Sequence, residues 1–74
     1  ELAALRKRIS AAEQLTKKLS RDIETMDAKL ADLFASDPVK AAQLAKTRTE
    51  AAAQLAAAEE EWLNASAELE TASL

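Results

Sequence analysis

The stretch LADLFASDPVKAAQL, residues 30–44, contains the only proline of the chain and decides how the chain folds. Proline lacks a backbone N–H and disfavours helical geometry in the residue before it, so Asp37-Pro38 ends any continuous helix. The same pair favours a new helix, because Asp37 can cap the free N–H groups of a first turn and proline is tolerated at the first helical position. We therefore expect one helix over about residues 2–34, a turn over 35–37 and a second helix over about 38–72.

Apolar residues keep a three-four spacing outward from this turn in both directions. Such a seven-residue repeat places a narrow apolar seam along each helix and drives the helix to pack against a second one. Since a short turn joins the two seams, the sequence predicts an all-α fold, a two-helix antiparallel coiled-coil hairpin, which we expect to be monomeric. The expected seam positions are Leu2, Leu5, Ile9, Ala12, Thr16, Leu19, Ile23, Met26, Leu30 and Leu33 in the first helix, and Ala41, Leu44, Arg48, Ala51, Leu55, Ala58, Trp62, Ala65, Leu69 and Ala72 in the second.

Side-chain sizes suggest the register of the two helices. If the hairpin folds about Asp37, large seam residues face small ones, as dense packing requires. Trp62 then faces Ala12, and we expect it to anchor the open end of the hairpin.

One seam position carries a charge. Arg48 is expected to extend along the seam and meet Asp22 or Asp27; alternatively, it sets the register, as isolated polar seam residues can.

The composition of the 74-residue chain excludes several kinds of site. A chain of this length forms at most one small domain. It has no cysteine, histidine or glycine, so disulfides, thiolate or imidazole metal sites and glycine-rich phosphate loops are excluded. We expect no enzyme activity, no catalytic residue, no cofactor and no metal in this chain. Because it begins with Glu1 rather than methionine, we expect a fragment of a larger protein.

No targeting signal is recognisable in these residues. No apolar run approaches the ~20 residues of a membrane span, and no signal peptide is visible. We therefore expect a cytoplasmic location and no membrane contact.

Charge is distributed unevenly although the net charge is only −3. Residues 1–21 carry six cations and two carboxylates, whereas residues 50–70 carry six carboxylates and no cation. The expected register places these stretches side by side, where they favour antiparallel pairing. Arg8 and Glu68 are the expected ion pair.

Four cations are expected to face solvent on the first helix, away from the second helix. Such a basic stripe can contact phosphates of nucleic acid through the backbone, without reading its sequence. Alternatively, these are ordinary solvated side chains of a coiled coil. The candidate nucleic-acid-binding residues are Lys7, Lys17, Lys18 and Arg21.

A faint second apolar stripe lies on the second helix and could dock another helix. The alternative is that its alanines are present because alanine favours helix. The stripe consists of Ala42, Ala45, Ala52, Ala56 and Leu63.

Three stretches resemble the C-terminal coiled-coil domain of ABC-F ATP-binding cassette proteins, particularly the Uup-like branch. They are LRKRISAAEQ (5–14), DAKLADLFASDPVKAAQLAKTR (27–48) and LAAAEEEWLNAS (55–66). In that family a leucine-rich helix ends in a LAD–DP turn and the second helix carries an EExW box. The matching residues here are Leu30, Ala31 and Asp32, then Asp37 and Pro38, then Glu59, Glu60, Glu61 and Trp62.

The resemblance implies an accessory hairpin of a soluble ATPase that contacts DNA or ribosomal RNA, many members of the family acting on ribosomes in translation. ATP and Mg would bind in the parent cassettes, which this chain lacks. The net charge of −3 departs from the more basic family pattern. Two alternatives remain: a purely structural or oligomerisation coiled coil with no nucleic-acid role, and a tRNA-binding hairpin like that of seryl-tRNA synthetases.

Overall fold

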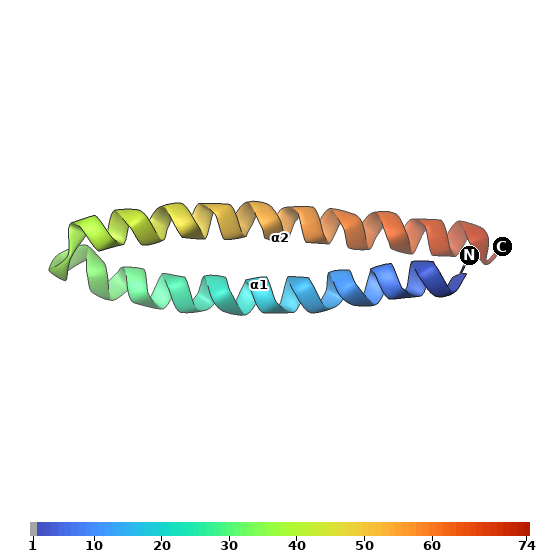
Figure 1. Cartoon of the computed structure of the whole chain (residues 1–74), viewed down its shortest axis with the longest axis horizontal. Coiled ribbons are helices and arrows are strands. Elements are labelled where there is room, and N and C mark those ends of the chain that lie inside the picture. Colours follow the sequence, from blue (N-terminus) through green and yellow to red (C-terminus); the bar gives the residue numbers. More distant parts are fainter. Residues whose placement is uncertain (1) are drawn as a thin grey trace.

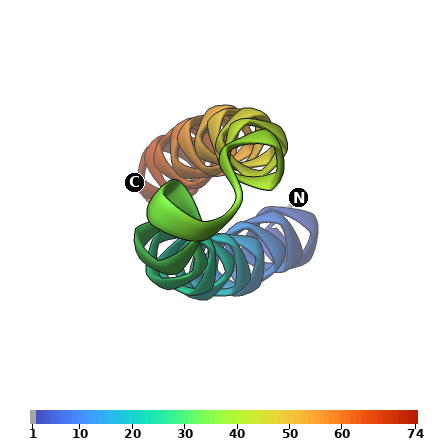
Figure 2. The same ribbon diagram turned by 90° about the vertical axis from the view of Figure 1, so that its left-hand side faces the viewer.

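The computed structural model describes residues 2–74, which form two long helices folded back on each other (Figure 1). Helix α1 spans Leu2–Ser36 and helix α2 spans Pro38–Ala72. The hairpin measures 56 × 14 × 13 Å, and the chain ends lie together opposite the turn. Figure 2, viewed along the hairpin from the turn, shows that the two helices wind around each other. The all-α antiparallel hairpin is confirmed, with α1 extending two residues further than predicted.

A single residue joins the helices. Asp37 leaves helical geometry, with φ −152° and ψ 84°. Its backbone N–H donates to the Leu33 carbonyl at 2.8 Å, which completes the last turn of α1. Its carboxylate accepts a hydrogen bond from the Lys40 N–H at 3.1 Å, and its carbonyl accepts one from the Ala41 N–H at 3.0 Å. Asp37 therefore caps α2, and Pro38 occupies the first turn as the sequence predicts.

The predicted seam lies at the interface between the helices. All ten predicted positions of α1 are buried or half-buried, and so are eight of the ten in α2. The two exceptions are Trp62 and Ala72. The buried residues within 2–74 are five alanines and two leucines: Ala12, Leu19, Leu30, Ala41, Ala51, Ala58 and Ala65. The interface is therefore close but small in apolar area.

The middle of the hairpin supports the predicted register. Leu19 packs in one cluster with Ala51 and Ala58. Ile23, Met26 and Leu55 pack against this cluster and are themselves half-buried. Pairing about Asp37 predicts the layers that this cluster contains, Ile23 with Ala51 and Leu19 with Leu55.

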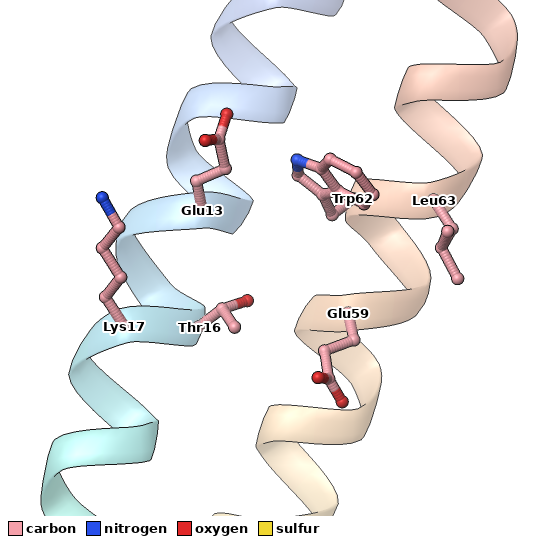
Figure 3. Close-up of a pocket in the computed structure, with 6 residues that line it drawn as sticks. All are labelled: Glu13, Thr16, Lys17, Glu59, Trp62 and Leu63. Atoms are coloured by element: carbon pink, nitrogen blue, oxygen red, sulfur yellow. The ribbon is translucent and has the colours of Figure 1, made fainter.

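Trp62, expected to face Ala12 and anchor the open end, is less buried than the other large side chains of the seam. Its side chain extends toward α1, but 39% of the residue remains exposed (Figure 3). The neighbouring seam positions Ala12, Ala58 and Ala65 are all buried, which shows that the helices approach closely here. An indole ring is too bulky for an alanine-lined space of this kind, so it lies at the side of the seam.

Candidate functional site

The four predicted nucleic-acid-binding residues all lie exposed on α1. Three of them, Lys17, Lys18 and Arg21, fall within about 6 Å along the helix axis. Lys7 stands apart, about 15 Å from Lys17 and about 21 Å from Arg21 along the same axis. The structure therefore places one cluster of three cations and one separate cation on this helix.

One member of the cluster already has an ionic partner. Lys18 Nζ lies 2.6 Å from Asp22 Oδ2, one helical turn away. The contact was missed in the sequence although its spacing of four residues is the usual one for helix ion pairs. In the described part of the chain, the side chains of Lys7, Lys17 and Arg21 make no hydrogen bond or ion pair. These three residues are the free cations of the predicted stripe, and we call them the basic face of α1.

A neighbouring cation, Arg8, links the two helices instead of facing solvent freely. Its guanidinium donates to Glu68 at 2.6 Å, as predicted, and to Glu61 at 2.6 Å. The hydrogen bonds from Arg8 to Glu61 and then Glu68 raise the arginine pKa above its ordinary value. The Glu61 contact was missed, although Glu61 and Glu68 are spaced by one seven-residue repeat and so share a flank of α2.

The seam arginine also bridges the helices, with one of its two predicted partners. Arg48 donates from Nε to Asp27 Oδ1 at 2.5 Å and from Nη2 to Asp27 Oδ2 at 3.3 Å. These hydrogen bonds hold the pKa of the Asp27 carboxyl below its usual value, and they raise the pKa of Arg48. Arg8 and Arg48 are thus both engaged in ion pairs between the two helices.

The flank of α2 beside the open end carries a surplus of negative charge. Glu61 and Glu68 are satisfied by Arg8. Glu59, Glu60 and Glu70 are exposed and form no ion pair within residues 2–74. The hairpin therefore presents a basic face on α1 and an acidic surface on α2.

A groove beside Trp62 is the second candidate site, and it was not predicted. It has a volume of about 520 Å³ and is lined by Glu13, Thr16, Lys17, Glu59, Trp62 and Leu63 (Figure 3). Leu63 is 60% exposed and extends away from α1, whereas Trp62 extends toward it (Figure 3). Lys17 belongs both to this groove and to the basic face of α1. A smaller groove of about 480 Å³ lies by Arg8, Leu15 and Gln54.

Neither candidate site contains a recognisable metal centre. Within the described residues no group of three or more acidic side chains is placed to hold a metal ion. Neither helix of residues 2–74 has an apolar stretch long enough to cross a lipid bilayer. The surfaces that the structure offers to a ligand are therefore a set of free cations and an apolar groove with charged edges.

Comparison with known proteins gives no relative for this chain. No family model, no curated protein and no solved structure matches it. The candidate sites are accordingly assigned from the geometry of the hairpin itself.

Proposed function

We propose that the hairpin is a non-catalytic arm that contacts nucleic acid through backbone phosphates, using the basic face of α1. The observation that supports this most directly is that the cations of this face have no ionic partner within residues 2–74. Lys7, Lys17 and Arg21 are exposed and lack side-chain partners within residues 2–74, whereas the adjacent Arg8 is held between two glutamates. Cations without protein partners are the ones that can replace the counterions of a phosphate backbone.

The shape of the molecule supports the same proposal. The three cations span about 21 Å of one uninterrupted helix, a length over which duplex DNA presents several phosphates on each strand. No sequence reading is expected, because phosphate contacts carry no base information. With three contacts and a net charge of −3, the affinity should be in the weak non-specific range, a Kd of roughly 10⁻⁴ M or higher at physiological salt.

We infer that the parent protein is an ABC-F ATPase of the Uup-like branch, with this hairpin as its C-terminal accessory. The resemblance in the LAD–DP turn and the EExW box supports this assignment, and the hairpin geometry is compatible with it. Under this proposal ATP and Mg bind in cassettes outside this chain, the nucleic acid is DNA or ribosomal RNA, and the protein acts in the cytoplasm.

A purely structural role is the second candidate. The observation that favours it is that both Arg8 and Arg48 bridge α1 to α2, so part of the charge pattern serves to align the helices. This role predicts no affinity for nucleic acid at any salt concentration.

A matched pair of charge reversals tests the proposal. The first variant combines Lys7→Glu, Lys17→Glu and Arg21→Glu, and the control combines Lys29→Glu, Lys40→Glu and Lys46→Glu near the turn. Both change the net charge by the same amount. Circular dichroism should show unchanged helicity, because none of the six side chains lies in the seam. Binding to duplex DNA and to ribosomes is then measured at low salt.

The proposal predicts that the first variant loses binding to at least one of the two ligands while the control keeps most of it. Equal losses in both variants would mean that only net charge matters and would remove the basic face as a site. Absence of binding by the native hairpin would favour the structural role.

A further inference from the structure

The groove at Trp62 continues into an apolar strip along α2, beside the seam. Trp62 and Leu63 are exposed at one end of it. Toward the turn, Ala45 and Ala52 are half-buried by α1, and Ala42 and Ala56 are exposed. Their spacing of three and four residues is that of a second helix-packing seam. Within residues 2–74 nothing covers this side of α2, which we call the flank.

The small core of a single hairpin gives a reason why a partner should cover this flank. Among residues 2–74 no large side chain is fully buried, and the buried set is dominated by alanine. Chains of this size are usually supported by disulfides, metals or oligomerisation. The chain has no cysteine, so the first of these is excluded.

We propose that this flank docks a second copy of the same chain, in a two-fold dimer whose turns lie at the same end. In this arrangement the symmetry axis runs parallel to the hairpin, and α1 of each copy faces α2 of the other. The indole of Trp62 and the side chain of Leu63 are then covered by α1 of the partner subunit.

Charge complementarity selects this arrangement. Residues of α1 and α2 whose numbers add up to about 74 lie at the same height along the hairpin, as the contacts of Arg8 with Glu61 and Glu68 illustrate. In the same-end dimer Arg6 comes level with Glu70 of the partner subunit, and Lys17 with Glu59 of the partner subunit. With the turns at opposite ends, α1 would face α1 of the partner subunit. The cations of the two α1 helices would then lie opposite each other across the interface.

One whole face of the hairpin is about as large as a dimer interface requires. Stable interfaces bury about 800 Å² on each partner. A hairpin 56 Å long and 14 Å wide offers one face of roughly this size. The sequence predicts a monomer, but the partly exposed Trp62 and Leu63 leave apolar surface that a second copy can cover.

Dimer formation and nucleic-acid binding share Lys17, but the two can be tested separately. Dimer formation is measured without nucleic acid. The dimer would cover Lys17. Lys7 and Arg21 would then remain on the outer surface for phosphate contacts.

Sedimentation equilibrium of the native chain, over roughly 1 to 200 μM, tests whether the dimer exists. The variant Leu63→Gln should raise the dimer dissociation constant at least tenfold. The control Leu15→Gln makes the same chemical change at an exposed leucine that lines the other groove, and it should leave the constant unchanged. Circular dichroism checks that both variants stay helical.

A second measurement needs no variant. Trp62 is the only tryptophan, so its fluorescence emission reports on this groove alone. Emission should shift to shorter wavelength as the native chain is concentrated. A monomer at all concentrations, a constant emission maximum, or equal weakening by Leu63→Gln and Leu15→Gln would each overturn the proposal.

The orientation is tested with a spin label on Ser36→Cys, beside the turn. Because the chain has no other cysteine, one label is attached per copy. Turns at the same end predict a label separation below about 25 Å. A separation near the length of one helix, about 50 Å, would show turns at opposite ends and contradict the proposed arrangement.

Discussion

Arg48 of α2 and Asp27 of α1 are joined across the hairpin by two hydrogen bonds, from Nε to Oδ1 and from Nη2 to Oδ2. The arginine occupies a seam position that the heptad pattern reserves for apolar residues, and it is half-buried there. Asp27 keeps its guanidinium at the edge of the seam. This pair ties the two helices together between the turn and the central Leu19 cluster.

The Asp27 carboxyl should make the stability of the hairpin depend on pH in the acid range. Its folded-state pKa lies below the ordinary value of 3.8, because Arg48 binds the charged form. The stabilisation is therefore fully present above about pH 4 and is lost as the pH falls through the lower folded-state pKa. Thermal midpoints of the native chain and of Asp27→Asn, measured from pH 7 to pH 2, should converge at the acid end.

The exposed Asp32 provides the control for this titration. Asp32→Asn removes a carboxylate of the same helix that makes no ion pair within residues 2–74. Its melting curve should stay parallel to that of the native chain over the whole pH range. The role assigned to the Asp27–Arg48 pair would be contradicted in two cases. Either the thermal midpoints of native and Asp32→Asn converge at low pH, or the difference between native and Asp27→Asn stays constant with pH.

Arg8 should stabilise the hairpin through its two glutamates in a manner that depends on salt. Arg8→Gln leaves Glu61 and Glu68 close together without a cation, so the thermal midpoint should fall at low salt. The difference from native should shrink at 1 M salt, where the screening length is only about 3 Å. Arg6 is also exposed, and within residues 2–74 it forms no ion pair with these glutamates, so Arg6→Gln should cause a smaller change. Equal effects would mean that the two contacts of Arg8 contribute nothing specific.

Two core substitutions should lower the free energy of unfolding in an order opposite to the size of the side chain removed. Leu19→Ala should cost more than Trp62→Ala. Leu19 is buried, and Leu19→Ala should cost about 2–5 kcal/mol of unfolding free energy. Trp62 is partly exposed, so Trp62→Ala should cost less than the roughly 3–5 kcal/mol typical of buried aromatic residues. Urea unfolding, at protein concentrations where the hairpin is monomeric, measures both. A larger loss for Trp62→Ala would mean that the indole is enclosed in the seam in solution.

The fold was predictable because its determinants are local in the sequence. The seven-residue repeat assigns one side of each helix to the interface, and Asp37-Pro38 marks where one helix must end and the next begin. The same reasoning predicted the Arg8–Glu68 contact and limited the partner of Arg48 to Asp22 or Asp27, of which Asp27 is the one observed, because register and charge sign restrict the choice.

The groove at Trp62 could not be predicted from the repeat. The position of a residue in the repeat indicates which way its side chain points. It does not indicate the distance between the two helices. The buried alanines Ala12, Ala58 and Ala65 bring the helices together at this point, and the indole is left at the side. The pairing of Lys18 with Asp22 was predictable from its spacing alone, and it reduces the expected stripe of four free cations to three.

The claim that the basic face of α1 contacts phosphates is tested most directly by the salt dependence of binding to duplex DNA. On the monomeric hairpin, three neutralised phosphates predict that log K falls with log salt concentration at a slope near −2.7. Arg21→Gln should make the slope less negative by about 0.9, and Lys46→Gln on α2 should leave it unchanged. A slope near zero for the native chain, or the same slope in Arg21→Gln as in native, would contradict the account.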